Sequence, residues 1–314
     1  MLINEKRIAV DSGKFATKFA MNTAEGVRKG SFRTKLSPWN GTGSAGADSH
    51  IVTLEGKTWV IGEAASDSSV SFDTSKASDL HRMSVYTAAA LLADNNDSII
   101  LGIGCPLRNY YNEKDRENYL SSIAPAGKII DITVDGVRKH FIIHRSSVFA
   151  ESSGVISSDP AGFMRSTVGV IDIGGLNVNA IIYKHMHPVI ETYISEEAGG
   201  NVLSKTIRDA FQERFNAQLK DYVMDDILRK GYSGSRISPE EQKKLVKEYK
   251  KKHAESILND CKKAQWPLDF LDIRFCGGAS VFLKDELKEV FGVDDSSFVP
   301  DAEYANVLGF MARL

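Results

Sequence analysis

One short pattern occurs twice in this chain, once near the start and once near the middle. The first copy reads RIAVDSGKFATKFAM and the second reads GVIDIGGLNVNAII. Each is an apolar strand, an Asp-x-Gly triplet, three intervening residues and a second strand, so that Asp11 matches Asp172 and Gly13 matches Gly174. A repeated strand-turn-strand unit indicates repeated structure. The sequence therefore predicts two related α/β domains that face each other, with the function between them.

The remainder of the chain supports an α/β class, because apolar strands alternate with helical patterns throughout. Helices are expected from about Asn201 to Arg214, from Pro239 to Lys263, and from Phe149 onward. A hairpin with an Asp135-Gly136 turn is expected in KIIDITVDGVRKHFIIH. With 314 residues, of which 42% are hydrophobic, the chain has enough apolar material for two cores.

Charge and hydropathy exclude several classes of function. The net charge is -2, so the chain is not expected to coat nucleic acid, and no direct nucleic acid contact is expected. Glu5, Lys6 and Arg7 stand where a signal peptide would need an apolar core. No run reaches the roughly 18 apolar residues of a membrane helix. A cytoplasmic protein without membrane contact is expected.

The residues of the repeated turn favour phosphate binding. Glycine approaches a ligand closely and adopts positive φ without strain, so a glycine-rich hairpin tip can direct several backbone N–H groups at one anion. A carboxylate beside that anion is tolerated when Mg²⁺ lies between them, which makes Asp11 and Asp172 candidate partners of metal-bound water. A single Asp-x-Gly turn is common in proteins that bind nothing there. Its repetition favours two hairpins that hold one triphosphate from opposite sides.

Five motifs, in order along the chain, resemble the actin, Hsp70 and sugar kinase superfamily. The two hairpins look like its phosphate 1 and phosphate 2 loops, and VFAESSGVISSD resembles the first connecting helix. EEAGGNVLSKTI and RFCGGASVFLKDEL resemble the nucleotide-base segments, and EYANVLGFMARL resembles the second connecting helix. The short length, the segment VIGEAA and the glutamate at position 151 are most similar to ParM-type plasmid-segregation actins.

The resemblance implies a fold and its boundaries. It implies two related actin-like (ribonuclease H-like) domains, each a mixed sheet flanked by helices, with a nucleotide cleft between them. Domain I would comprise residues 1–165 plus 301–314, and domain II residues 166–300.

The resemblance also implies roles for individual residues. Glu151 would orient the attacking water, Asp172 would share the catalytic site, and Lys18 would reach the β- and γ-phosphates. Mg²⁺ would be held by Asp11 and Asp172 through water. The implied nucleotide-binding residues are Asp11, Gly13, Lys14, Phe15, Lys18, Gly174, Gly175, Leu176, Asn177, Gly199, Gly200, Asn201, Lys205, Gly277, Gly278 and Ala279. Leu176 and Asn177 stand where many relatives have hydroxyl residues, so γ-phosphate contacts would come from backbone N–H groups or from Asn177.

By resemblance, the expected function is that of a polymerising ATPase. ATP, or GTP, with Mg²⁺ would drive head-to-tail filaments of this chain, and hydrolysis would weaken them. A ParR-type DNA-binding adaptor on centromere-like DNA is the implied partner. Two alternatives stay open: a small-molecule kinase of the same superfamily, and a nucleotide-dependent adaptor that forms no filaments. The kinase would need an aspartate base near an acceptor pocket, and the region after SIILGIGCP offers no obvious sugar-binding set.

Overall fold

The computed structural model describes residues 5–41, 43–66 and 79–314. The chain divides into two compact units. Unit 1 is Met1–Ser157 with Asn306–Leu314, and unit 2 is Ser158–Ala305. Each has its own apolar core.

The sheet of unit 1 has the strand order β3-β2-β1-β7-β9-β8-β5-β6-β4. Its strands are β1 (Glu5–Ser12), β2 (Ala16–Thr23), β3 (Gly26–Arg33), β4 (Leu36–Pro38), β5 (Ser49–Leu54), β6 (Lys57–Gly62), β7 (Ser98–Cys105), β8 (Lys128–Val134) and β9 (Val137–Ala150). Its helices are α1 (Asp79–Leu92), α2 (Leu107–Tyr110), α3 (Glu113–Ile123) and most of the 3₁₀ helix η2 (Ser153–Ser158). Strands β1, β7 and β9 are parallel neighbours. Their carboxyl ends therefore lie at one edge of the sheet.

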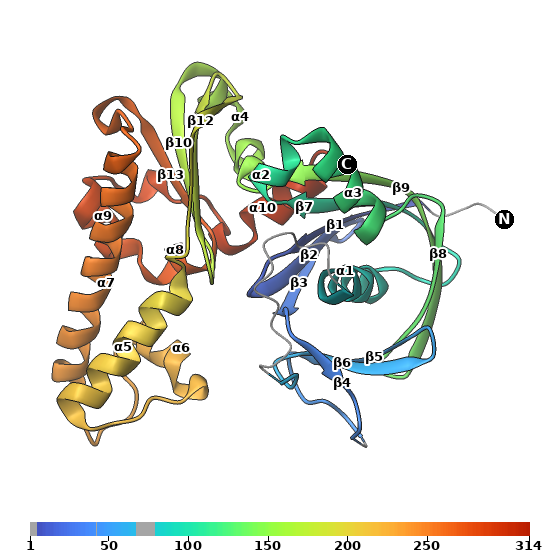
Figure 1. Ribbon diagram of the computed structural model, residues 1–314, viewed down its shortest axis with the longest axis horizontal. Coiled ribbons are helices and arrows are strands. Elements are labelled where there is room, and N and C mark those ends of the chain that lie inside the picture. The colour runs from blue at the N-terminus through green and yellow to red at the C-terminus, as the bar shows by residue number, and fades with distance from the viewer. Residues whose placement is uncertain (1–4, 42, 67–78) are drawn as a thin grey trace. The chain divides into compact units, whose positions relative to one another are not determined.

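Helix α1 is buried on all sides. Figure 1 shows the sheet of unit 1 curving round it, and α1 packs against β1, β2 and β8. Polar Ser84 and Thr87 are as buried as the neighbouring Val85 and Ala88. The run Ala88–Ala90 combines high helix propensity with small side chains, which suits a helix enclosed by a curved sheet.

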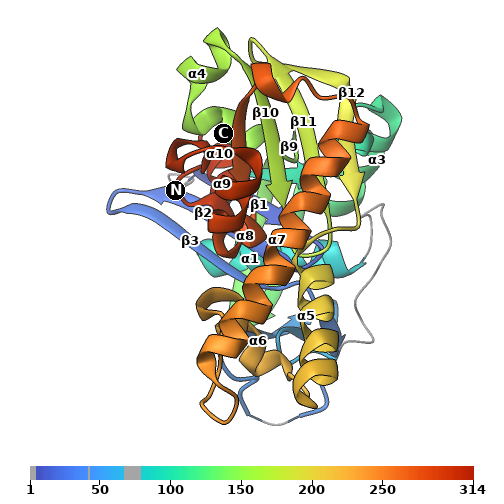
Figure 2. The ribbon, with the colours of Figure 1, turned by 90° about the vertical axis from the view of Figure 1, so that its left-hand side faces the viewer.

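The sheet of unit 2 has the strand order β12-β11-β10-β13. Its strands are β10 (Thr167–Ile173), β11 (Val178–Lys184), β12 (His187–Glu196) and β13 (Asp272–Cys276). Its helices are α4 (Pro160–Arg165), α5 (Gly200–Phe215), α6 (Asp221–Lys230), α7 (Pro239–Lys263), α8 (Gly278–Phe282) and α9 (Lys284–Phe291), with 3₁₀ turns η3 (Leu268–Phe270), η4 (Asp295–Ser297) and η5 (Ala302–Tyr304). Helices α7 and α9 cover one face of the strands (Figures 1 and 2). Helix α10 (Ala305–Met311) leads back into unit 1.

Most elements expected from the sequence are present. Helix α7 has the predicted bounds, and its start is marked by Ser238, whose Oγ accepts from the Glu241 N–H, followed by Pro239 in the first turn. The Asp135-Gly136 turn has φ of 49° and 80°, as a two-residue hairpin turn requires. Within the described residues, no helix is long and apolar enough to cross a bilayer.

Candidate functional site

The first repeated hairpin joins β1 to β2 in unit 1. Asp11 pairs with Lys18 across the two strands, and Ser12 pairs with Thr17. Directly opposed residues of an antiparallel pair share a face of the sheet. The Asp11 carboxylate and the Lys18 ammonium are therefore presented side by side on one face, and both are half-buried. On the other face Thr17 is fully buried, and its hydroxyl bonds that of Thr34 at 2.9 Å.

The tip of this hairpin is bound to the end of β3. The Phe15 carbonyl accepts from the Thr34 N–H at 3.0 Å and from Arg33 Nε at 3.2 Å. The Arg33 guanidinium also lies 3.7 Å from the centroid of the Phe15 ring. Lys14 and Gly13, beside it, are half-buried. Arg33 was not singled out from the sequence, because its contact with the tip forms only when β2 and β3 pair.

Two carboxylates of unit 1 lie at the carboxyl ends of its parallel strands. Asp11 lies near the end of β1 and Glu151 directly follows β9. Between them runs β7, where a Cβ added to Gly104 would lie 2.9 Å from Asp11 Oδ1. The Glu151 N–H donates to Cys105 O at 2.8 Å. Gly104 thus leaves room for the Asp11 carboxylate at this edge.

Buried Tyr119 lies close to the same strand ends. Its hydroxyl donates to Gly104 O at 2.9 Å. Burial raises the pKa of Tyr119 well above its ordinary value, and Cys105, Glu151 and Asp11 raise this pKa further. Neither Gly104 nor Tyr119 was singled out from the sequence. The signal for Gly104 was present, since a glycine inside a buried strand often marks a close approach.

The expected helix at Phe149 is wrong. Strand β9 continues to Ala150, Ser152 has a φ of 67°, and only a 3₁₀ helix follows. Serine and glycine favour turns over helix, and the Ser153 hydroxyl bonds the Ala150 carbonyl at 2.6 Å. Glu151 is therefore positioned by a strand end and a turn.

The second hairpin, in unit 2, repeats the register of the first. Asp172 pairs with Asn179, and Ile173 with Val178, just as Asp11 pairs with Lys18 and Ser12 with Thr17. Asn179 thus takes the place of Lys18. Its Oδ1 accepts from the Tyr193 hydroxyl at 3.1 Å and from the Ser195 hydroxyl at 2.9 Å, which ties this hairpin to β12.

The start of α5 holds the glycine-rich loop of the second hairpin. The N–H groups of Gly199, Gly200 and Asn201 donate to the carbonyls of Leu176, Gly174 and Gly175 at 2.9, 3.0 and 2.7 Å respectively. In a trans peptide the carbonyl of one residue and the N–H of the next point in opposite directions. The loop carbonyls face α5, so the N–H groups of residues 175–177 face away from it. Three successive N–H groups of a turn that face the same way are a common arrangement for binding an anion.

Gly277 brings α8 close to the same loop. Its φ is 87°, and an added Cβ would lie 2.4 Å from Asp172 Oδ1. Its N–H donates to Ala302 O at 2.8 Å. Unit 2 therefore brings together Asp172, residues 174–177, residues 199–201 and residues 277–279. Lys205 lies further along α5 and is exposed.

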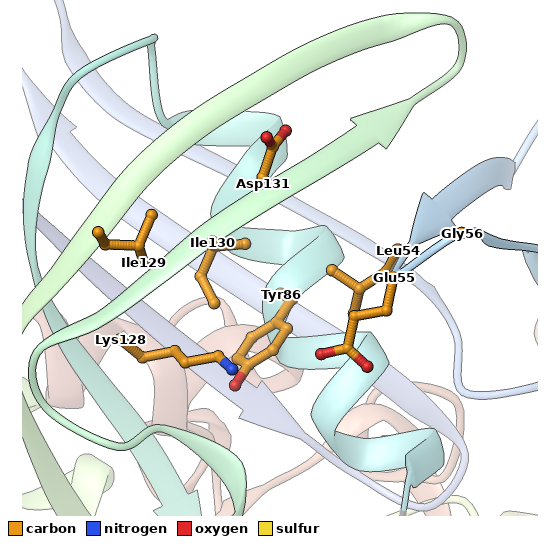
Figure 3. A pocket seen from close by; sticks show the side chains of 8 residues that line it. All are labelled: Leu54, Glu55, Gly56, Tyr86, Lys128, Ile129, Ile130 and Asp131. Atoms are coloured by element: carbon orange, nitrogen blue, oxygen red, sulfur yellow. The ribbon is translucent and has the colours of Figure 1, made fainter.

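A cavity of about 370 Å³ lies elsewhere in unit 1 (Figure 3). It opens where β5 and β8, which pair through Val52–Leu54 and Ile132–Val134, diverge. Its lining residues are Leu54, Glu55, Gly56, Tyr86, Lys128, Ile129, Ile130 and Asp131, none of which was expected at the site. Among the described residues, no group of three or more His, Cys, Asp or Glu side chains is arranged to hold a metal ion.

Comparisons with known proteins identify the fold. The archaeal actin homologue Ta0583 has a TM-score of 0.79 and 17% identity over 98% of each chain. Alp12, in a filament structure, has a TM-score of 0.73 and 27% identity over 99% of this chain and 98% of its own. Apo ParM of pSK41 has a TM-score of 0.72 and 15% identity over 98% of this chain and 96% of its own. A further structure of Ta0583 is a complex with ADP. The curated protein sequences contain no match.

The paired hairpins and these structural matches define the class as a protein of the actin fold. Residues 9–154 match the family model for the N-terminal domain of actin-like proteins. Over these residues the chain is similar to the actin-like proteins, and it shares its fold with ParM and Alp12.

Proposed function

We propose that this chain is an actin-like nucleoside triphosphatase that assembles head to tail into filaments when Mg-nucleotide is bound. The observation that carries the proposal is the repeated hairpin. In both copies an aspartate occupies the same register position beside a glycine-containing tip. In unit 1, a glutamate follows the end of β9, at the same edge of the sheet.

The proposed phosphate contacts come from both hairpins. In unit 2 the N–H groups of residues 175–177 bind phosphate oxygens, since α5 engages the loop carbonyls and turns these donors outward. In unit 1 Lys18 supplies a positive charge, and its pairing with Asp11 fixes the strand position from which it reaches a phosphate.

The carboxylates of Asp11 and Asp172 fit Mg²⁺. This ion keeps several waters and is held in nucleotide sites by one or two carboxylates together with phosphate oxygens. Asp172 is buried and Asp11 is half-buried, so each has the restricted solvent access of a ligand-facing group. When bound, the ion neutralises charge on the phosphates.

Glu151 acts as the base for the attacking water. Its carboxylate orients a water for in-line attack and accepts one of the water protons. The new bond forms between the water oxygen and the γ-phosphorus. The bond from that phosphorus to the bridging oxygen breaks, and the electron pair stays on the nucleoside diphosphate.

Filament formation is supported by the relatives. Alp12 and AlfA from a B. subtilis plasmid are both known as filament structures. We extend this to the present chain as a head-to-tail polymer, in which one surface meets a different surface of the next copy. Plasmid DNA segregation through a ParR-type adaptor is the cellular role we propose for it, with ATP or GTP as the nucleotide.

The test is nucleotide binding by Asp11→Ala and Asp172→Ala. Each should weaken Mg²⁺-dependent binding of ATP and GTP by at least about tenfold, the usual effect of losing a hydrogen bond to a charged group. Asp131→Ala is the control, because it removes an exposed ion pair with Arg138. Parent-like affinity in both variants would show that these aspartates do not bind the nucleotide.

Sedimentation with and without Mg-nucleotide tests assembly, and a chain that stays monomeric throughout would favour a kinase or adaptor.

A further inference from the structure

The peptide group that carries Glu151 is held at both ends. The Glu151 N–H donates to Cys105 O at 2.8 Å, and Ser153 Oγ donates to Ala150 O at 2.6 Å. The Ala150 carbonyl and the Glu151 N–H belong to one planar peptide group. These two hydrogen bonds therefore fix the orientation of the plane from which the Glu151 side chain leaves the strand.

The next residue needs such support. Ser152 is fully buried with a φ of 67°, a left-handed conformation that is unfavourable for a residue other than glycine. Its hydroxyl has no hydrogen-bond partner among the described residues. A strained backbone persists only where its surroundings hold it. Here the holding contacts come from the residues on either side.

Arg313, near the end of the chain, orients one of these contacts. Its Nη2 donates to Ser153 Oγ at 2.9 Å, and its guanidinium lies 4.6 Å from the centroid of the Phe149 ring. Phe149 in turn stacks on Phe310 of α10 at 5.3 Å. A serine hydroxyl has a single hydrogen. Because its oxygen accepts from Arg313, that hydrogen is directed to the Ala150 carbonyl.

We propose that Ser153 and Arg313 are positioning residues for Glu151. Ser153 fixes the peptide plane that precedes the Glu151 side chain, and Arg313 fixes the hydroxyl of Ser153. The inference rests on the proposed role of Glu151 in hydrolysis, and it adds a requirement: the end of the chain sets the rate of the chemical step without touching nucleotide.

The experiment compares phosphate release by Ser153→Ala and Arg313→Gln in the parent and in a Glu151→Gln background. Small misplacements of a reacting group cost large factors in rate. In the parent each change should lower kcat by roughly tenfold and leave KM and nucleotide affinity unchanged. In the Glu151→Gln background neither should slow the reaction further, because the group they position is gone. Arg313 is exposed, so its variant tests the idea without disturbing a core.

Ser121→Ala is the matched control. Its Oγ donates to the carbonyl three residues earlier, that of Asn118, at 3.0 Å on α3. This variant should keep the parent rate. Equal slowing by Ser153→Ala in both backgrounds, or a parent rate for both positioning variants beside a slow Glu151→Gln, would overturn this inference alone. A parent rate for Glu151→Gln would remove the proposed role of Glu151, and this inference with it.

Discussion

Asp11 can occupy its place because β7 has no side chain at residue 104. A Cβ there would lie 2.9 Å from Asp11 Oδ1 and 3.0 Å from the ring of Phe310. Gly102, two residues earlier, faces the side chains of Phe149 and Leu314 instead. Both glycines therefore leave room for neighbouring side chains beside β7, but only Gly104 lies next to a residue of the proposed site, Asp11.

Gly104→Ala should displace the Asp11 carboxylate and weaken Mg-nucleotide binding by roughly tenfold, the effect of losing about one charge-assisted contact. Gly102→Ala is the control, since its methyl group would meet only apolar side-chain ends. Both affinities and both melting temperatures would be measured. Equal affinities in the two variants would show that the Gly104 contact does not matter for binding.

At the scale of single residues, the sequence predicts those whose signal lies in the residues next to them. The sequence singles out Asp11 and Asp172 because each stands beside a glycine turn and the turn repeats, and their role in binding stays a prediction. Gly104, Tyr119 and Arg313 were not singled out, because their contacts join distant parts of the chain. Glu151 was named by resemblance, but its backbone was expected to be helical.

Elements with strong local signals were predicted well. Helix α7 begins at a serine cap followed by proline and keeps apolar residues on one face, so its bounds could be read from the sequence. The end of strand β9 was harder to predict. Its last residues, Val148–Ala150, extend beyond its partner β8 and pair with β7 alone. Pairing with a distant strand, which local propensity does not encode, decides their conformation.

Helices α7 and α9 pack across a buried pair of opposite charge. Burial lowers the pKa of Lys250 and raises the pKa of Glu286, and in both cases the attraction of the partner is the smaller effect. For the pKa of each group, burial thus outweighs the attraction of the partner. Exchange of such pairs for apolar residues is often neutral or stabilising.

Lys250→Met combined with Glu286→Leu should leave the free energy of unfolding unchanged or raise it by about 1 to 4 kcal/mol. Lys250→Met alone should lower it by about 2 kcal/mol at neutral pH, because Glu286 stays buried without its partner. Urea denaturation measures both.

The stability of Lys250→Met should depend on pH. In Lys250→Met the folded pKa of Glu286 is raised further above its ordinary 4.5. The folded state then binds the proton more tightly than the unfolded state. The free energy of unfolding therefore falls as the pH rises from the unfolded pKa of Glu286 to its folded pKa. The deficit of the single variant should shrink as the pH falls toward 4.5, and the double variant should show no such recovery. A double variant less stable than the single one would refute the argument.

On the scale of the whole molecule, the chain passes between its units at 157/158 and at 305/306. Within unit 1 these two connections touch. A Cβ added to Gly309 would lie 2.0 Å from Gly154 O, and Ser157 Oγ donates to Gly309 O at 3.3 Å. The Glu151 turn precedes one connection and Arg313 follows the other. The proposed catalytic glutamate is therefore attached to both connections between the units.

If hydrolysis weakens filaments, loss of Glu151 should separate assembly from disassembly. In Glu151→Gln, Mg-nucleotide should still bind and light scattering should still rise above a critical concentration, since the phosphate contacts are intact. Phosphate release should slow by roughly 10²-fold, the contribution of a positioned base. After a limited pulse of nucleotide, scattering should then decay more slowly by a similar factor, because the γ-phosphate that supports the contact persists. Asn177→Ala is the informative comparison, since Asn177 is the last residue of the 175–177 loop and its side-chain amide is the alternative group to hold the water. Unchanged release and decay in Glu151→Gln, together with a clear loss in Asn177→Ala, would move the catalytic role from the end of β9 to the loop of unit 2.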